Sequence, residues 1–250
     1  MTTAEARPVA LITGGTTGIG LATAHVLAEQ GYAVVATGQN PDTIAAARQV
    51  LPDDVTLLRA DARVLADAAS VADEVRARYG GLDAVFLNAG IGAMLPIEAV
   101  DEATFDDTFA VNVKGQFFTL QAVLPLLRTG GSVVLMGARG VSLGAPNYAV
   151  PTATKGAMMA MVAPLAVELA PRGIRVNAVV PAAIDTPAFD KLGLAPEARS
   201  AFGDFVSKRL LVGRTGTADD VARLVGFLVS PAAGFITGAN VAIDGGMGVS

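Results

Sequence analysis

The fold is decided by the stretch Val9-Ala10-Leu11-Ile12-Thr13-Gly14-Gly15-Thr16-Thr17-Gly18-Ile19-Gly20. A short apolar run enters a glycine-rich turn there, and an amphipathic segment from Leu21 to Gln30 leaves it. This pattern predicts a buried strand, a phosphate-cradling loop and the start of a helix, because glycine lets a pyrophosphate approach the main chain and a helix N-terminus favours an anion. The spacing is Gly-x-x-x-Gly-x-Gly rather than the usual Gly-x-Gly-x-x-Gly, so a turn that binds no ligand is an alternative at this point.

Composition and charge narrow the class of protein. The 250 residues are 52% hydrophobic and 16% charged, which allows a substantial core. A net charge of −5 without a basic run argues against nucleic acid as a partner. The absence of cysteine excludes disulfides and fits a cytoplasmic protein. The segment from Met1 to Pro8 is not typical of a signal peptide, and no uninterrupted apolar run reaches about 18 residues, so no membrane span is predicted.

Short apolar runs alternate with helical patterns along the chain. The runs predict strands at Val9–Ile12, Tyr32–Thr37, Val55–Arg59, Leu82–Leu87, Ser132–Met136, Arg175–Val180 and Asn240–Ile243. The helical patterns lie at 21–30, 41–51, 65–79, 101–128, 151–170 and 218–228, and Pro164 predicts a bend in the fifth of them. This alternation predicts an α/β fold with one parallel sheet, formed by a single domain over residues 1–250. The Pro- and Gly-rich segment 183–213 follows a strand end, so it is interpreted as a substrate lid, with a surface insertion as the alternative.

Several short motifs fall in order along the whole chain. They are Thr13-Gly14, Gly18-Ile19-Gly20, Asp61, Asn88-Ala89-Gly90, Asn112, Lys155, the run from Arg172 to Val179 with Pro181, Ile236-Thr237-Gly238 and Asp244-Gly245-Gly246. This ordered set resembles the short-chain dehydrogenase/reductase family, and the resemblance covers nearly all 250 residues. It implies a doubly wound Rossmann-type parallel sheet with helices on both faces, carrying a nicotinamide dinucleotide.

The resemblance also implies which residues hold the cofactor. They are Gly14, Thr16, Thr17, Gly18, Ile19 and Gly20 around the pyrophosphate, Gln39 by the adenosine ribose, Asp61 by the adenine, Asn88, Ala89 and Gly90 along the cofactor, Pro181, Ile184 and Thr186 by the carboxamide, and Lys155 at the nicotinamide ribose. Gly20 would in addition let the helix pack closely on the sheet. No metal-ligand constellation is visible in the sequence.

Two of the expected catalytic positions depart from the family pattern. Family members orient the carbonyl with a serine hydroxyl and protonate it with a tyrosine four residues before the lysine. Here those positions are Ala138 and Pro151, and neither side chain can donate a proton. The family mechanism therefore cannot run unmodified, although Asn112 and Lys155 are retained as its other catalytic residues.

Three alternatives follow. Tyr148 could serve as substitute acid, with Ser142 as a further donor; Lys155 or a water could give the proton; or the site could bind a ligand without turnover. The first two describe an atypical NAD(P)-dependent oxidoreductase acting on a small carbonyl or alcohol substrate. The third describes a non-catalytic cofactor-binding homologue that acts as a sensor, scaffold or partner subunit.

The residues after the second predicted strand bear on the choice of cofactor. Thr37-Gly38-Gln39-Asn40 contains neither the acidic residue that selects NAD nor the arginine that pairs with the 2′-phosphate of NADP. Because no carboxylate repels that phosphate, NADP is favoured, and NAD stays open. The resemblance further implies a homo-oligomer, a dimer or tetramer, paired through the helix that follows Lys155 and the helix before it.

Overall fold

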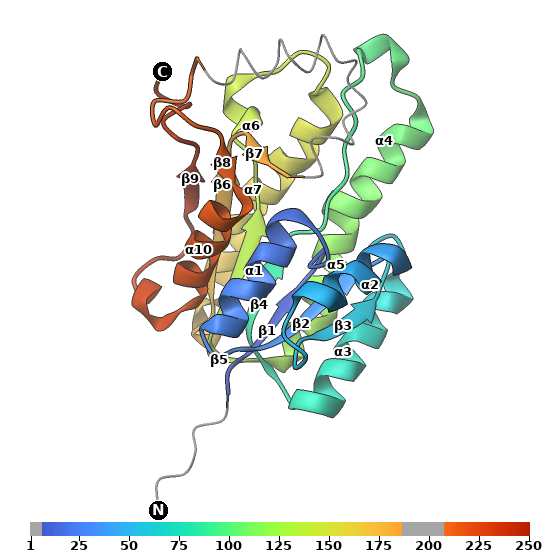
Figure 1. Cartoon of the computed structure of the whole chain (residues 1–250), viewed down its shortest axis with the longest axis vertical. Helices are drawn as coiled ribbons and strands as arrows, with labels where there is room; N and C mark the ends of the chain where they lie inside the picture. Colours follow the sequence, from blue (N-terminus) through green and yellow to red (C-terminus); the bar gives the residue numbers. More distant parts are fainter. Residues whose placement is uncertain (1–6, 187–207) are drawn as a thin grey trace, which may run out of the picture.

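Within residues 7–186 and 208–250, which this computed structural model describes, seven parallel strands form one sheet. Their order is β3-β2-β1-β4-β5-β6-β9 (Figure 1). The strands are β1 (Val9–Ile12), β2 (Ala33–Gly38), β3 (Thr56–Arg59), β4 (Leu82–Leu87), β5 (Leu127–Met136), β6 (Arg175–Pro181) and β9 (Asn240–Ile243). The order reverses between β1 and β4, and ligands of such sheets bind beyond the carboxyl ends of the strands at this point.

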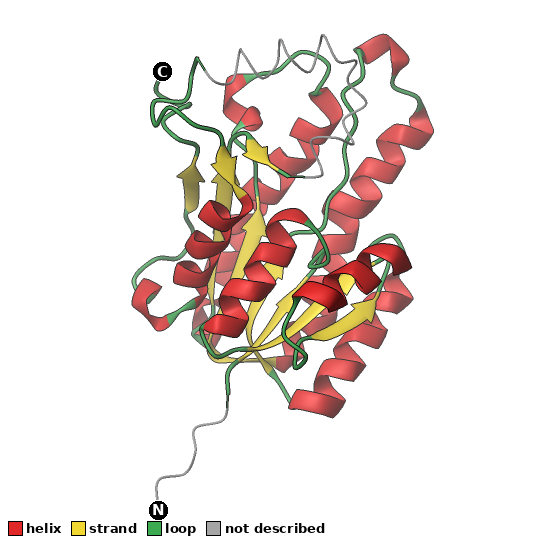
Figure 2. Cartoon of the chain, viewed as in Figure 1, coloured by secondary structure: helices red, strands yellow, loops and turns green. Residues whose placement is uncertain are grey.

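Helices lie on both faces of the sheet (Figure 2). They are α1 (Gly18–Glu29), α2 (Pro41–Val50), α3 (Leu65–Tyr79), α4 (Glu102–Phe109), α5 (Gln116–Val123), α6 (Gly140–Leu143), α7 (Ala149–Leu169) and α10 (Ala218–Val229). A second, two-stranded sheet pairs β7 (Ile184–Asp185) with β8 (Gly216–Thr217). The predicted fold class, a doubly wound Rossmann-type parallel sheet, is confirmed.

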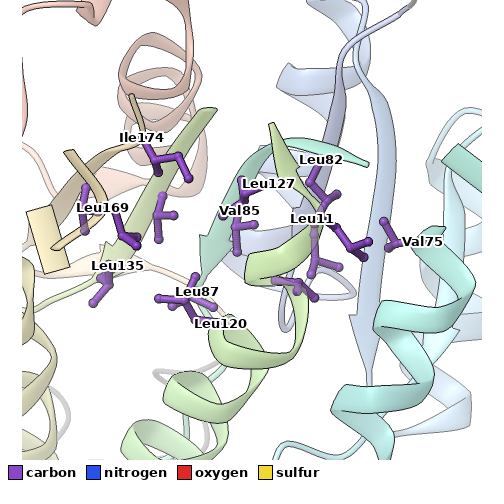
Figure 3. Packing of buried hydrophobic residues seen from close by; sticks show 14 of the residues in the cluster. Leu11, Val75, Leu82, Val85, Leu87, Leu120, Leu127, Leu135, Leu169 and Ile174 are labelled. Carbon is purple, nitrogen blue, oxygen red and sulfur yellow. The ribbon is translucent and has the colours of Figure 1, made fainter. Parts of the chain in front are cut away.

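The core consists of two layers that share the sheet. Along β1, Val9 and Leu11 pack with α3, α5 and α7, whereas Ala10 and Ile12 pack with α1, α2 and α10. Figure 3 shows the first layer, in which Leu11 lies near Val75. Successive side chains of a strand point to opposite faces, so a strand covered on both sides must be apolar throughout. This explains why inner strands such as β1, β2 and β4 stand out in the sequence as continuous apolar runs.

The single helix expected over 101–128 is wrong. The chain forms α4, then a π-helical turn (Ala110–Gly115), then α5, then a 3₁₀ turn (Leu124–Leu126). Pro125 accounts for the end of α5, because proline has no backbone N–H to donate and so cannot continue the i→i−4 hydrogen bonds of the helix. The strand expected from Ser132 already begins at Leu127, and its register against β4 shifts before Ser132.

Helix α7 begins at Ala149, two residues earlier than predicted, and continues past Pro164. The bend predicted at Pro164 stays a prediction. By length and composition alone, the helical stretch Ala149–Arg172 is long and apolar enough to cross a membrane, with a mean hydropathy of 1.2. Only 28% of this apolar window is buried, and Met158 and Val162 belong to the face that packs in the first core layer. Most of the expected lid, residues 187–207, lies outside the described residues.

Candidate functional site

A cavity of about 720 Å³ lies at the carboxyl ends of the strands. Its volume is in the range that holds a small molecule or cofactor. It brings together most of the predicted site residues, namely Gly14, Thr16, Thr17, Gly18, Ile19, Gln39, Asp61, Asn88, Ala89, Gly90, Tyr148, Lys155, Pro181, Ile184 and Thr186. Two predicted residues, Gly20 and Asn112, are not among its lining residues.

The glycine turn after β1 offers a cradle for an anion. Gly14 and Gly18 have positive φ angles of 62° and 53°, which residues with a side chain rarely adopt. The N-cap residue of α1, Thr17, makes no side-chain cap, so its hydroxyl does not cover the first N–H groups of the helix. These groups are the donors that hold phosphates at helix N-termini. The residues present therefore fit a dinucleotide pyrophosphate.

Gly20 lies behind this cradle rather than in its wall. A Cβ at Gly20 would lie 2.1 Å from the carbonyl oxygen of Gly14 and 2.7 Å from Nδ2 of Asn88. Gly20 is also buried. It therefore allows α1 to pack closely against the turn, and it supports the cradle without lining it.

Hydrogen bonds fix the loop after β4 to the glycine turn. The hydroxyl of Thr13 accepts from the backbone N–H groups of Asn88 and Ala89 at 2.9 and 3.0 Å, and it donates to Gln116 at 2.7 Å. The side-chain amide of Asn88 donates to the carbonyl oxygens of Thr13 and Gly14, each at 3.0 Å. Two walls of the cavity are thus held in a fixed relation before any ligand binds.

Asn112 lies in the π-helical turn and is buried. Its Oδ1 accepts from the N–H of Ile91 at 2.7 Å, and its Nδ2 donates to the carbonyl of Ile91 at 2.8 Å and to Oγ1 of Thr154 at 3.0 Å. The Thr154 hydroxyl donates to the carbonyl of Pro151 at 2.7 Å. In the described contacts, Asn112 clamps the loop after β4 to the start of α7. Single π turns inside helices often occur at functional sites.

Lys155 places an amine in the cavity wall. Its Nζ donates to the carbonyl oxygen of Met136 at 3.2 Å and lies against Gly90, where a Cβ would be 3.3 Å away. Among residues 7–186 and 208–250, no carboxylate forms an ion pair with it. Because burial disfavours the charged form, the pKa of Lys155 falls from 10.5 to about 8.

The two residues expected in place of the family serine and tyrosine, Ala138 and Pro151, lie near Lys155 in different ways. Ala138 lines the cavity, and Pro151 is buried one helical turn before Lys155. A Cβ at Gly92 would be 3.1 Å from Cγ of Pro151 and 3.9 Å from the hydroxyl of Tyr148, so the proline ring and the phenol both border Gly92. Burial raises the pKa of Tyr148 above its ordinary value of 10.0.

Local backbone geometry explains how Tyr148 reaches the cavity. The preceding residue, Asn147, has a φ of 64°, and its carbonyl accepts from the N–H of Leu95 at 2.8 Å. Asparagine tolerates this left-handed conformation better than most residues. Ser142, considered as a second donor, hydrogen-bonds the carbonyl of Arg139 at 3.3 Å and is not a lining residue.

Two arginines that sequence reasoning missed approach Gln39. The Nε of Arg59 donates to the backbone carbonyl of Gln39 at 3.3 Å, and Nη1 of Arg63 donates to its Oε1 at 2.7 Å. Arg63 also pairs with Asp61 at 3.1 Å and with Asp107. The hydrogen bond from Arg63 lowers the pKa of Asp107, and the same bond raises the pKa of Arg63. Parallel pairing of β2 with β3 could have revealed Arg59, since it stands beside Gly38.

The opposite end of the cavity contains residues that no motif indicated. Arg139, Leu143 and Met247 line it, with Met94 and Ala183. Met247 belongs to the C-terminal segment, far in sequence from the other loops. In the described part of the chain, no group of three or more His, Cys, Asp or Glu side chains lies together as a metal site would require.

Comparison with known proteins gives concordant results. Residues 14–248 match a family profile described as Enoyl-(Acyl carrier protein) reductase. The chain is 34% identical over 243 residues to D-threitol dehydrogenase of Mycolicibacterium smegmatis, covering 95% of this chain and 92% of the relative. Two structures from Brucella melitensis are similar. A short-chain dehydrogenase/reductase described as glucose/ribitol dehydrogenase has a TM-score of 0.90 at 30% identity, over 97% of both chains. A 3-ketoacyl-(acyl-carrier-protein) reductase complexed with NADH has a TM-score of 0.88 at 30% identity, over 97% of this chain and 98% of that one.

Proposed function

The chain belongs to the short-chain dehydrogenase/reductase family of oxidoreductases, and from this premise we propose that it is an atypical NAD(P)-dependent carbonyl reductase or alcohol dehydrogenase in which Lys155 is the proton donor. The observation that carries the proposal is the partly buried Lys155 amine, which lines the cavity without an acidic partner among the described residues. Ala138 and Pro151 stand where the resemblance places the family serine and tyrosine.

The cavity supplies the contacts a dinucleotide needs. The glycine turn and the N-terminus of α1 would hold the pyrophosphate, Gln39 the adenosine ribose, and Asp61 the adenine region. Pro181, Ile184 and Thr186 would border the nicotinamide carboxamide. When bound, the reduced nicotinamide supplies a hydride to the carbonyl carbon of the substrate. The protein must then give a proton to the carbonyl oxygen.

Lys155 suits this proton transfer better than Tyr148. A general acid works best when its pKa is near the operating pH. With a pKa of about 8, Lys155 is mostly protonated at neutral pH and still gives up its proton readily. Burial raises the pKa of Tyr148, and no described cation offsets that effect. We assign the proton transfer to Lys155 Nζ, which becomes a neutral amine and is reprotonated from solvent, and we assign to the Tyr148 hydroxyl the orientation of the carbonyl.

We propose NADP as the preferred cofactor. The Oε1 of Gln39 is occupied by Arg63, so its amide N–H groups are free to donate to the ribose or its phosphate. The Nη groups of Arg59 make no described hydrogen bond, and its Nε is held at Gln39. The charge of Arg63, in contrast, is shared with Asp61 and Asp107. Arg59 is thus the cation nearest the expected 2′-phosphate with donors to spare.

We also propose a homo-oligomer, a dimer or tetramer, paired through α5 and α7. Both helices expose large apolar side chains on the described surface, with Val167 of α7 77% exposed and Phe117 of α5 40% exposed. A second copy of the chain would cover them. Sedimentation at several concentrations tests this, and a monomer at every concentration would refute it.

The catalytic proposal is tested with NADPH, NADH and a panel of activated ketones. An arginine side chain keeps the positive charge but does not release its proton, so Lys155→Arg should lower the rate of reduction by about 10² to 10⁴. Tyr148→Phe removes only the orienting hydroxyl and should lower the rate by a smaller factor than Lys155→Arg does. Lys114→Arg, on the exposed face of the π turn, is the matched control and should have no effect. A larger loss in Tyr148→Phe than in Lys155→Arg would transfer the donor role to Tyr148. Cofactor binding without turnover of any ketone would favour the non-catalytic homologue.

A further inference from the structure

We propose that Arg139 is a positioning residue that locks the C-terminal segment 244–250 against the cavity, and that the wall so formed selects carbonyl substrates with an apolar, uncharged body. The inferred substrate preference rests on the proposed function. The attachment of segment 244–250 by Arg139, called the lock below, rests on contacts that are independent of that function.

Arg139 and Asp244 form a mostly buried ion pair between two segments that are distant in the sequence. Nε of Arg139 lies 2.9 Å from Oδ2 of Asp244, and the two side chains are only 25% and 14% exposed. The Nε atom is buried, and its N–H is not aligned for a hydrogen bond with that oxygen. The backbone of Arg139 is itself anchored, because its N–H donates to the carbonyl of Pro181 at 2.8 Å.

Asp244 organises the segment that Arg139 holds. Its Oδ1 accepts from the N–H of Gly246, and its Oδ2 from the N–H of Gly248, each at 3.0 Å. Its carbonyl accepts from the N–H of Met247, also at 3.0 Å. One carboxylate therefore shapes the turn and pairs with the guanidinium. Loss of the pair would free the turn from the rest of the cavity wall.

The absence of a side chain at Gly248 leaves room for the guanidinium of Arg139. A Cβ at Gly248 would lie 1.6 Å from Nη2 and 2.2 Å from Cζ of Arg139. The guanidinium thus lies against the backbone of the C-terminal segment at Gly248, at a distance that leaves no room for a Cβ. An alanine at this position would displace the guanidinium.

The locked segment carries Met247 into the cavity wall. Met247 is 7% exposed and forms a small apolar cluster with Leu210, Leu143 and Ala183. Met247 and Leu143 line the same cavity as Lys155 and Ala138. An apolar group of the substrate would contact Met247 and Leu143 at the end of the cavity away from Gln39. A charged group there would lose its hydration, and the charge of Arg139 is already matched by Asp244.

Hydrogen exchange of the C-terminal peptide tests the lock without requiring turnover. In Arg139→Met, the amides of Gly246 and Gly248 should exchange at least about tenfold faster than in the unmodified protein, since local opening governs their protection. Gly248→Ala should have the same effect by a different route and serves as the second variant if Arg139→Met does not fold. Arg223→Met, which breaks an exposed pair with Asp219, is the control. Unchanged exchange in both test variants would overturn the proposal.

Selectivity is tested with three carbonyl probes that differ in their body: diacetyl, acetylbenzoyl and phenylglyoxylate. The buried phenyl group should give acetylbenzoyl a kcat/KM about 10- to 100-fold above diacetyl, and phenylglyoxylate should be the poorest. Arg139→Met should raise KM for acetylbenzoyl by about tenfold, more than for diacetyl, with a smaller change in kcat. Arg139→Lys, which can keep the ion pair, should restore part of the preference.

The two proposals fail in different ways. A preference for phenylglyoxylate, or equal use of the diketones, would overturn the apolar wall while leaving the oxidoreductase intact. If no ketone is reduced, the proposed function fails, and calorimetric binding of acetylbenzoyl to the cofactor-loaded protein decides the apolar wall alone. Weaker binding by Arg139→Met supports it, and equal binding refutes it.

Discussion

Replacing Lys155 with methionine should stabilise the protein at neutral pH while abolishing reduction. The Lys155 ammonium is partly buried in the cavity wall, and desolvation lowers its pKa from 10.5 to about 8. A shift of this size corresponds to about 3 kcal/mol of unfavourable free energy for holding the charged form in the folded state. Methionine removes this term and also the hydrogen bond to the carbonyl of Met136, which contributes about 1 kcal/mol. The net gain is about 2 kcal/mol, or about 4 to 8 °C in Tm for a chain of this size.

The pH dependence of the free energy of unfolding shows whether the charge of Lys155 causes this gain in stability. Below pH 8 the lysine is protonated in both the folded and the unfolded chain, so the folded state carries the full penalty. Between pH 8 and 10.5 the folded chain loses its proton first, and stability that was lost at lower pH is regained. The difference between Lys155→Met and the unmodified protein should therefore be largest below pH 8 and should shrink toward pH 10.5.

Urea unfolding of the cofactor-free protein at several pH values measures this difference, with Lys114→Met as the exposed control. The control should shift the midpoint very little at any pH. If Lys155→Met is no more stable than the unmodified protein below pH 8, the amine is not held in a desolvated state and the argument for its acidity is lost. An equal difference at every pH would attribute the gain to packing rather than to charge.

Three further outcomes follow from the structure. The rate of carbonyl reduction should fall as pH rises through about 8, because Lys155 must be protonated, and the rate of alcohol oxidation should rise over the same range; initial rates against pH show whether they cross there. Arg59→Gln should weaken NADPH binding by about tenfold and NADH binding by much less, as measured by calorimetry with each cofactor, and an equal loss for both would remove Arg59 from the 2′-phosphate site. Gly20→Ala should destabilise the fold by more than about 3 kcal/mol, since its Cβ would lie 2.1 Å from the backbone oxygen of Gly14, whereas Gly156→Ala in the open interior of α7 should stabilise it by about 0.5 to 1 kcal/mol; denaturant midpoints compare the two.

The inner strands of the sheet, such as β1 and β4, could be predicted from the sequence because burial on both faces requires a continuous apolar run in each of them. The break in the helix expected over 101–128 could not, because it coincides with hydrogen bonds between Asn112 and Ile91, which lie 21 residues apart. The glycine turn was visible locally. The different roles of its glycines could not be predicted, since only the folded backbone shows that a Cβ at Gly20 would point at Gly14 rather than into the cavity.

Polar pairs between residues far apart in the sequence could not be predicted either, because local patterns do not show which distant segments meet in the fold. Arg139 and Asp244 are of residue types that usually lie exposed at the surface, and nothing in the sequence around either residue indicates that the two side chains meet. Arg59 is a partial exception. Once β2 and β3 are known to be parallel neighbours, the ends of the two strands must meet, and the approach of Arg59 to Gln39 follows.

The loss of one acid and the gain of another are, we infer, a single change at this site. In the family pattern a tyrosine anion would balance the lysine charge, and position 151 here offers only a buried proline ring. The Lys155 ammonium then donates a hydrogen bond to a backbone carbonyl but forms no ion pair with a described carboxylate. Its desolvation is therefore not offset by a negative charge, and its pKa falls toward neutrality. A lysine held in a balanced site would be too weak an acid to protonate a carbonyl. Under the proposed function, the proline at position 151 would therefore both take the place of the phenol and leave the Lys155 amine acidic enough to act instead. Introducing the phenol again with Pro151→Tyr tests this link, because the pH at which reduction declines should then move away from 8. A pH profile unchanged by Pro151→Tyr would separate the two residues and refute the inference.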